Sequence, residues 1–360
     1  MINIAMANFV AQWAEGDTLT IYVEYGTQGA AGFEFGQTST TLNGDPLQAF
    51  TTDTVLNFKL VASQRSFTVT SGNNQTGTVG SALATTIEVT ILDDYGNPAT
   101  GLAITSSGDG SATALAATDT NGKSTTTWTL GTTAGAQTLT LTTTSYGTAT
   151  VNATAIPDAV SAAKSTVEAI TPVVADNAAV STITITAKDQ YENVVAGKAV
   201  TVAATGSSNT LSSPANTDAS GVSTATLKSS VAEIKTVSAT IDGVQITDTA
   251  EVVFNPGPAA RVGVTPGTAT IASDTKGSVE LTATIYDAFD NVVTTDDSTA
   301  VTFTLTDGAY TSLSNTTDAN TLDVTVTDGV AKATVYTVAG QVPTPPASDG
   351  VNVTAGALTT

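Results

Sequence analysis

Apolar and polar residues alternate along three widely separated stretches of the chain, at residues 87–91, 183–187 and 281–285. Successive side chains of a β-strand point to opposite faces of the sheet, so alternation with a period of two indicates a strand with one buried face. We therefore predict a half-buried β-strand at each of these stretches.

A short acidic motif follows each predicted strand. It contains an Asp, an aromatic residue two positions later and an Asn two positions after that. The three copies are Asp93, Tyr95 and Asn97; Asp189, Tyr191 and Asn193; and Asp287, Phe289 and Asn291. Successive Asn residues of the motif are 96 and 98 positions apart, close to the roughly 100 residues of a β-sandwich domain. The repeat therefore predicts tandem sandwiches of similar length.

The composition favours an all-β fold. Thr and Val, which favour strands, are abundant, whereas only 12% of the 360 residues are charged. A chain of this length has room for about two to four domains. We predict a small β-rich domain at residues 1–65 and three sandwiches at residues 66–157, 158–257 and 258–360, the last boundary falling in a Pro-Gly-Pro linker.

A second turn signal repeats with the same period. Thr118-Asp119 precedes an alternating strand at residues 124–130, and Thr217-Asp218 precedes the corresponding strand of the next repeat. In the last repeat the best match is Thr327-Asp328-Gly329, and we place the final strand at residues 350–355.

Aromatic residues are concentrated at the start of the chain. Residues 1–65 hold eight of the 19 Phe, Tyr and Trp residues, and their first 13 positions fit either a helix or a strand. This segment is either a small β domain packed on its neighbour or a docking element for a partner assembly, since aromatic side chains dominate interface energies. Docking is the preferred interpretation. Its candidate residues are Phe9, Trp13, Tyr22, Tyr25, Phe33 and Phe35.

The chain has no Cys and no His. Disulfides, thiol nucleophiles, zinc fingers and histidine-based acid–base catalysis are therefore excluded. With 32 acidic and 11 basic residues the net charge is −21, so binding to nucleic acid or to an anionic membrane is not expected. We predict a non-enzymatic protein without a cofactor or metal.

The acidic motifs raise two chemical alternatives. Clustered Asp and Asn oxygens suit Ca²⁺, and the adjacent pairs Asp93-Asp94 and Asp296-Asp297 invite comparison with the paired carboxylates of glycosidases. Short Asp and Asn side chains also stabilise turns by bonding the local backbone. Turn formation is the preferred interpretation of all these acids.

Trp128 lies within an alternating strand. A sandwich core with few large residues depends on such side chains, so we predict that Trp128 and the aromatic residues of the acidic motifs pack in the cores. Stacking against a sugar is the alternative.

No stretch approaches the roughly 20 apolar residues of a membrane-spanning helix, so membrane insertion is not expected. The first basic residue is Lys59, whereas a secretory signal peptide needs a basic start. We therefore expect a native Met start without such a signal.

Several segments resemble the bacterial Ig-like group 1 repeat. These are residues 72–80, 94–98, 119–122 and 128–135 (GNNQTGTVG, DYGNP, DTNG and WTLGTTAG), together with residues 189–197 and 217–226. The last repeat is similar more loosely, and residues 1–65 lie outside the resemblance. This family occurs in invasin- and intimin-type surface proteins and in bacteriophage structural proteins. The resemblance implies an Ig-like fold and a spacer or display role.

Two functional assignments follow. The preferred one is a virion protein, a head-decorating or tail-associated subunit of a tailed bacteriophage. Residues 1–65 would dock on the assembly, and the sandwiches would project and touch host-surface glycans weakly. The absence of an export signal and the aromatic first segment favour it. The alternative is a bacterial cell-surface adhesin or extracellular filament subunit. Either assignment predicts a homo-oligomer or contacts with other structural proteins.

Overall fold

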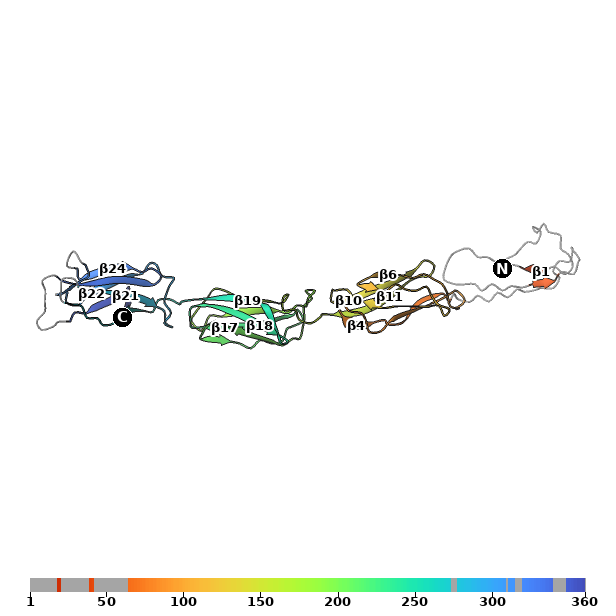
Figure 1. Ribbon diagram of the computed structural model, residues 1–360, viewed down its shortest axis with the longest axis horizontal. Helices are drawn as coiled ribbons and strands as arrows, with labels where there is room; N and C mark the ends of the chain where they lie inside the picture. The colour runs from red at the N-terminus through yellow and green to blue at the C-terminus, as the bar shows by residue number, and fades with distance from the viewer. Residues whose placement is uncertain are drawn as a thin grey trace. The chain divides into compact units, whose positions relative to one another are not determined.

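The computed structural model describes residues 18–20, 39–41, 64–272, 277–308, 310–314, 319–338 and 348–359. All regular elements among these residues are β-strands, which confirms the all-β prediction (Figure 1). The chain divides into two compact units, Met1–Ile156 and Pro157–Thr360. Near the start of the first unit, β1 (Thr18–Thr20) and β2 (Ser39–Thr41) form an antiparallel pair.

Residues 64–156 of the first unit form a β-sandwich, named sandwich 1. Its larger sheet has the strand order β4-β11-β10-β6, its smaller sheet the order β3-β5-β8, and β7 pairs with β9. The alternation at residues 87–91 correctly predicts β5, because Ile87, Val89 and Ile91 are buried. The strands are β3 (Ser66–Ser71), β4 (Gln75–Thr78), β5 (Ile87–Leu92), β6 (Thr105–Gly108), β7 (Ser111–Ala112), β8 (Lys123–Thr126), β9 (Trp128–Thr129), β10 (Gly135–Thr143) and β11 (Gly147–Ile156).

The predicted strand at residues 124–130 is divided in two. β8 pairs with β5 of the smaller sheet, whereas β9 pairs with β7. The chain therefore changes partner at Thr127, whose backbone N–H bonds the Thr113 hydroxyl at 3.0 Å. This change leaves Trp128 in the core, with no side-chain exposure and with its indole Nε1 donating to the Asp109 carbonyl at 2.7 Å. The core prediction for Trp128 is confirmed.

Sandwich 2 begins the second unit. Its sheets have the orders β12-β14-β17-β16 and β13-β19-β18-β15, and Figure 1 shows β18 and β19 side by side, as their antiparallel register requires. Ile183 and Ile185 of β14 are buried as predicted. The strands are β12 (Thr166–Ala169), β13 (Val173–Val174), β14 (Ser181–Thr186), β15 (Val200–Ala204), β16 (Asn209–Leu211), β17 (Val222–Ser229), β18 (Ile234–Ile241) and β19 (Val244–Asn255).

Sandwich 3 follows the Pro-Gly-Pro linker and has sheets of order β20-β21-β25-β23 and β24-β22-β26-β27. The predicted final strand is β26, but β27 follows it, because Gly356 at φ +58° permits a two-residue hairpin turn. The strands are β20 (Arg261–Thr265), β21 (Ser278–Tyr286), β22 (Ala300–Leu305), β23 (Thr311–Ser312), β24 (Thr321–Thr325), β25 (Val330–Thr337), β26 (Val351–Ala355) and β27 (Leu358–Thr359).

Each sandwich has its own buried apolar cluster, and no described cluster spans two sandwiches. The largest fully buried apolar side chains are Trp128 in sandwich 1, Phe254 in sandwich 2 and Phe303 in sandwich 3. A fully buried large aliphatic or aromatic side chain contributes about 1.5–3 kcal/mol. Stability therefore comes from separate cores.

The pairing of the end strands differs between the sandwiches. In sandwich 1, β4 pairs in parallel with the last strand β11, over Gln75 to Thr78. In sandwich 2, β13 pairs in parallel with the last strand β19, at Val173 and Val174. Every strand pair described in sandwich 3 is antiparallel.

Candidate functional site

The three acidic motifs form the same turn. In each copy one carboxylate oxygen of the Asp accepts two backbone N–H groups, from the aromatic residue and from the Asn, at 2.8–2.9 Å. The backbone of the Asp also donates to the carbonyl of the Asn at 2.9 Å. The preferred turn interpretation accounts for these contacts, since the Asp side chain satisfies N–H groups that no strand partner reaches.

The turns of sandwiches 2 and 3 also hold the chain that enters each sandwich. Asp158 N donates to the second carboxylate oxygen of Asp189 at 3.0 Å, and Gly257 N donates to that of Asp287 at 2.8 Å. Asp189 and Asp287 are buried, whereas Asp93 of sandwich 1 is half-buried. The turn Asp is therefore an anchor for the incoming linker in both sandwiches of the second unit.

The titration of these carboxyls follows from their contacts. Burial raises the pKa of Asp189, but N–H donors from Asn193, Asp158 and Tyr191 outweigh it, and the pKa lies below its usual range. The pKa of Asp287 is lowered in the same way against its burial by the donors Asn291, Gly257 and Phe289. Both groups are therefore held in the charged form.

The hydrogen bonds of the turn carboxylates argue against the alternative that these turns bind Ca²⁺. Both carboxylate oxygens of Asp189 and of Asp287 already accept N–H donors. A cation would have to replace these donors. Within the described ranges, no three acidic side chains gather closely enough to hold a metal ion. The donor set therefore favours the turn interpretation over calcium binding.

The prediction that the motif aromatics pack in the cores is wrong. Tyr95, Tyr191 and Phe289 have 46%, 40% and 45% of their surface exposed. The strand ends before the Asp, and the third turn residue gives its N–H to the Asp, so its side chain does not continue the alternation of the strand. Sugar contact, the alternative for these residues, stays open.

The fourth turn position has a left-handed backbone, with φ +82° at Gly96, +71° at Glu192 and +67° at Asp290. Glycine adopts this conformation freely, whereas other residues are strained there. The two acidic residues each form an ion pair, Glu192 with Lys164 at 2.9 Å and Asp290 with Arg261 at 2.7 Å. Both pairs are exposed and contribute little.

The glycine of the second turn signal is hydrogen-bonded to the strand that leads into the acidic turn. The carbonyls of Gly122, Gly221 and Gly329 accept the N–H of Ile91, Ala187 and Ile285, respectively, at 2.8–2.9 Å. Each donor lies near the end of the strand that precedes the acidic turn. The alignment of Thr327-Asp328-Gly329 with the earlier repeats is therefore confirmed.

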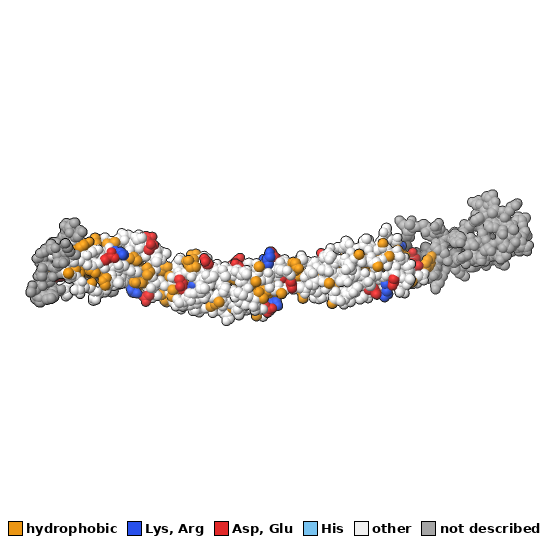
Figure 2. Space-filling model, in the orientation of Figure 1, with side chains coloured by type: hydrophobic (Ala, Val, Ile, Leu, Met, Phe, Trp, Pro, Cys, Tyr) orange, Lys and Arg blue, Asp and Glu red, His pale blue; other side chains and the backbone are white. Residues whose placement is uncertain are grey.

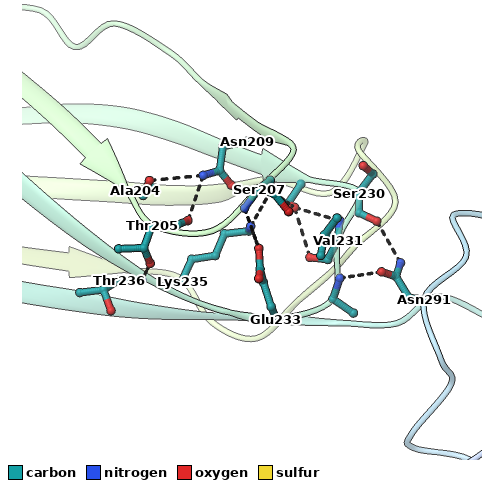
Figure 3. Close-up of polar contacts among 12 residues, drawn as sticks. Ala204, Thr205, Ser207, Asn209, Ser230, Val231, Glu233, Lys235, Thr236 and Asn291 are labelled. Carbon is teal, nitrogen blue, oxygen red and sulfur yellow. Dashed lines mark hydrogen bonds and ion pairs between the residues drawn. The ribbon is translucent and has the colours of Figure 1, made fainter.

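The acidic turn of sandwich 3 also contacts sandwich 2. Asn291 Nδ2 donates to the Ser230 carbonyl at 2.9 Å, and its Oδ1 accepts the Ala232 N–H at 2.8 Å (Figure 3). Ser230 and Ala232 lie in the loop between β17 and β18, at the end of sandwich 2. The Asn291 side chain thus bonds one backbone donor and one backbone acceptor of the neighbouring sandwich.

A buried lysine lies beside this loop. Lys235 has no side-chain exposure, and its Nζ donates to Glu233 Oε1 at 2.6 Å and to the Ser207 carbonyl at 2.8 Å (Figure 3). The Glu233 pKa is lowered first by its bond from Lys235 and then by the Ser207 N–H. Asn209 Oδ1 is buried without a hydrogen-bond partner. Through Lys235 and Glu233, this cluster joins the end of the loop that Asn291 contacts to the backbone of Ser207.

Sequence reasoning did not identify the roles of Lys235 and Asn291. A signal for Lys235 was present, because it has the same phase in β18 as the buried Val237, Ala239 and Ile241. For Asn291 the sequence predicts the turn but not the neighbouring residues, since these lie 59 and 61 positions earlier in the chain.

The surface carries no concentrated charge on the face that Figure 2 shows. Over the described residues on this face, acidic and basic side chains occur in small scattered spots among backbone and uncharged side chains. No helix of the described residues is long and apolar enough to cross a membrane.

The adjacent acids Asp296 and Asp297 accept hydrogen bonds from the backbone. Asp296 accepts the N–H groups of Ser298 and Thr299, and Asp297 accepts that of Asp328.

The six docking candidates predicted from the sequence, Phe9, Trp13, Tyr22, Tyr25, Phe33 and Phe35, lie outside the described residues. Their role stays a prediction, and so does the domain boundary at residue 65.

Comparison with known proteins agrees with the fold. Residues 164–255 match the family model of the bacterial Ig-like domain (group 1), as the sequence resemblance predicted for this part of the chain. No curated protein sequence matches the chain.

Three solved structures of bacterial proteins are similar to this chain at low sequence identity. The Escherichia coli adhesin FdeC is 24% identical, with a TM-score of 0.44, over 76% of this chain and 88% of the adhesin. InvD of Yersinia pseudotuberculosis is 18% identical, with a TM-score of 0.47, over 81% of this chain and 92% of InvD. Invasin, described as a bacterial integrin-binding protein, is 22% identical, with a TM-score of 0.44, over 82% of this chain and 57% of invasin.

Proposed function

We propose that this chain is a non-enzymatic surface protein of a bacterium, in which Ig-like sandwiches display a binding region for host-surface or other proteins. The observation that carries the proposal is the succession of three sandwiches, each with its own core, one of which matches the bacterial Ig-like family. A series of separately stable modules is suited to spacing and presentation.

The chemistry of the described residues supports a binding role. Acidic side chains of the three turns bond backbone N–H groups, and the chain has no Cys or His that could act as nucleophile or base. The exposed aromatic residues of the turns are side chains of the kind that contribute to contacts with partners.

Labelling of intact cells tests the proposal. Antibodies raised against the full chain should label unpermeabilised cells of the source bacterium, and brief protease treatment of those cells should remove the signal. Cells that lack the gene should attach less to host tissue or to one another. Labelling only after lysis would overturn the surface assignment.

A virion subunit is the second candidate, because the aromatic residues of segment 1–65 suit docking on an assembly. Neither the sandwich fold nor the family match separates this assignment from surface display. The same antibodies distinguish them: label on purified phage particles, with none on uninfected cells, would support the virion assignment.

A further inference from the structure

One amide side chain of sandwich 3 contacts sandwich 2 with both its donor and its acceptor. Asn291 offers a donor to Ser230 O and an acceptor to Ala232 N, at 2.9 and 2.8 Å. The loop presents the complementary acceptor and donor two residues apart. Because a carboxylate has no donor and an aliphatic side chain has neither function, Asn has the chemistry that this loop requires.

The amide is held in place by the turn that carries it. Asn291 Nδ2 also donates to Asp287 Oδ2 at 2.8 Å, and the same Asp287 oxygen accepts the linker N–H of Gly257 at 2.8 Å. The loop of sandwich 2, the turn of sandwich 3 and the linker are thus joined through two side chains. This network also fixes which amide atom faces which backbone group.

Apolar packing contributes little at this place. A hollow of about 380 Å³ is lined by residues of both sandwiches, among them Ile234, Pro256 and Val292. Ile234 keeps 61% of its surface exposed. A junction without a closed apolar core depends on directional hydrogen bonds for its geometry.

We propose that the acidic turn of sandwich 3 is an inter-module recognition element. The partner that it fits is the end loop of the preceding Ig-like module, here Ser230 to Ala232, and Asn291 determines the fit. Asp287 is the positioning residue, because it orients the amide and anchors the linker. This role is independent of surface display, since it concerns how one module meets the next.

Spin-label distances test the proposal in the full chain. The chain has no cysteine, so Ser213→Cys in sandwich 2 and Thr325→Cys in sandwich 3, both exposed, give two unique labels. The parent should show a narrow distance distribution by double electron–electron resonance. Asn291→Ala should broaden it, and Asn291→Asp should broaden it at least as much, because its carboxylate would face the Ser230 carbonyl and Asp287.

Two further variants separate recognition from folding. Asn97→Ala changes the equivalent residue of sandwich 1, whose exposed side chain bonds Asp93 of its own turn at 3.4 Å, and it should leave the label distances unchanged. Ala232→Pro removes the N–H from the sandwich 2 side, with sandwich 3 intact, and should broaden the distances as Asn291→Ala does.

Hydrogen exchange gives an independent measure. The Ala232 amide should exchange about tenfold faster in Asn291→Ala, as the loss of hydrogen bonds to this side chain implies, whereas amides in the middle of β21 keep their protection. A broad distance distribution in the parent, or distributions in Asn291→Ala and Ala232→Pro as narrow as in the parent, would overturn the proposal.

Discussion

At the scale of single residues, two glycines of sandwich 1 share a backbone conformation but not an environment. Gly122 and Gly101 both have φ +71°. A Cβ on Gly122 would collide with the Ile91 carbonyl oxygen, whereas a Cβ on Gly101 would meet nothing within 4 Å. Replacing each of these glycines by Ala therefore separates the free-energy cost of a left-handed backbone from that of a steric collision.

Gly122→Ala should destabilise sandwich 1 by about 3 kcal/mol or more, and Gly101→Ala by about 1 kcal/mol. Urea unfolding followed by the fluorescence of buried Trp128 measures both, in a Trp13→Phe background that removes the chain's other tryptophan. Equal losses in the two variants would show that the collision is relieved by backbone movement.

The buried Lys235 leads to a second prediction, that removing its partner Glu233 destabilises sandwich 2 more than removing Lys235 itself. Glu233→Gln removes the anion and leaves a buried cation, so it should cost sandwich 2 about 1–2 kcal/mol, since Glu233 is 34% exposed and water screens part of the pair. Lys235→Met leaves a carboxylate that water can reach and should cost less, about 1 kcal/mol. Thermal unfolding of the two variants decides the order.

At the scale of elements, alternation located β5, β14 and β21, and the Asp-x-aromatic-x-Asn spacing located the turns. The sequence could not predict what surrounds the corresponding residues of the three turns. Asp189 and Asp287 are buried by an incoming linker that the motif does not contain. The aromatic of the motif was misplaced because strand alternation does not continue into a turn.

The acidic turns of sandwiches 2 and 3 are expected to lose stability at low pH. The folded-state pKa values of Asp189 and Asp287 are lowered, so their contribution is complete above the unfolded carboxyl pKa of about 3.9 and is lost as the pH falls through the folded values. Calorimetry should therefore show a nearly constant melting temperature from pH 7 to about 5 and a fall below about 4.

Asp189→Asn is the matched variant for this effect. It should unfold about 1–3 kcal/mol more easily at pH 7, because its amide places N–H groups against the Asp158 and Asn193 donors. Its stability should fall less between pH 5 and 3 than that of the parent. An equally steep acid transition in both proteins would assign the effect to other carboxyls.

At the scale of the whole molecule, the separate cores predict that the sandwiches fold without the first segment. Deleting residues 1–65 should leave the free energy of unfolding of the sandwiches within about 1 kcal/mol of the parent, since each sandwich has a core cluster of its own within residues 66–360. The deletion should abolish incorporation of the protein into its assembly, measured by co-sedimentation. Incorporation at the parent level would contradict the docking role of Phe9, Trp13 and the other candidates.

The parallel pairing of end strands has a mechanical consequence. When a sandwich is pulled along the chain, a parallel pair between its second and its last strand is sheared, so several hydrogen bonds carry the load together, and a sandwich without such a pair lacks this resistance. Sandwich 1 holds four such positions between β4 and β11, and sandwich 2 holds two between β13 and β19. Sandwich 3, with antiparallel pairs throughout its described strands, should yield first under tension and so lengthen the molecule before the other sandwiches unfold.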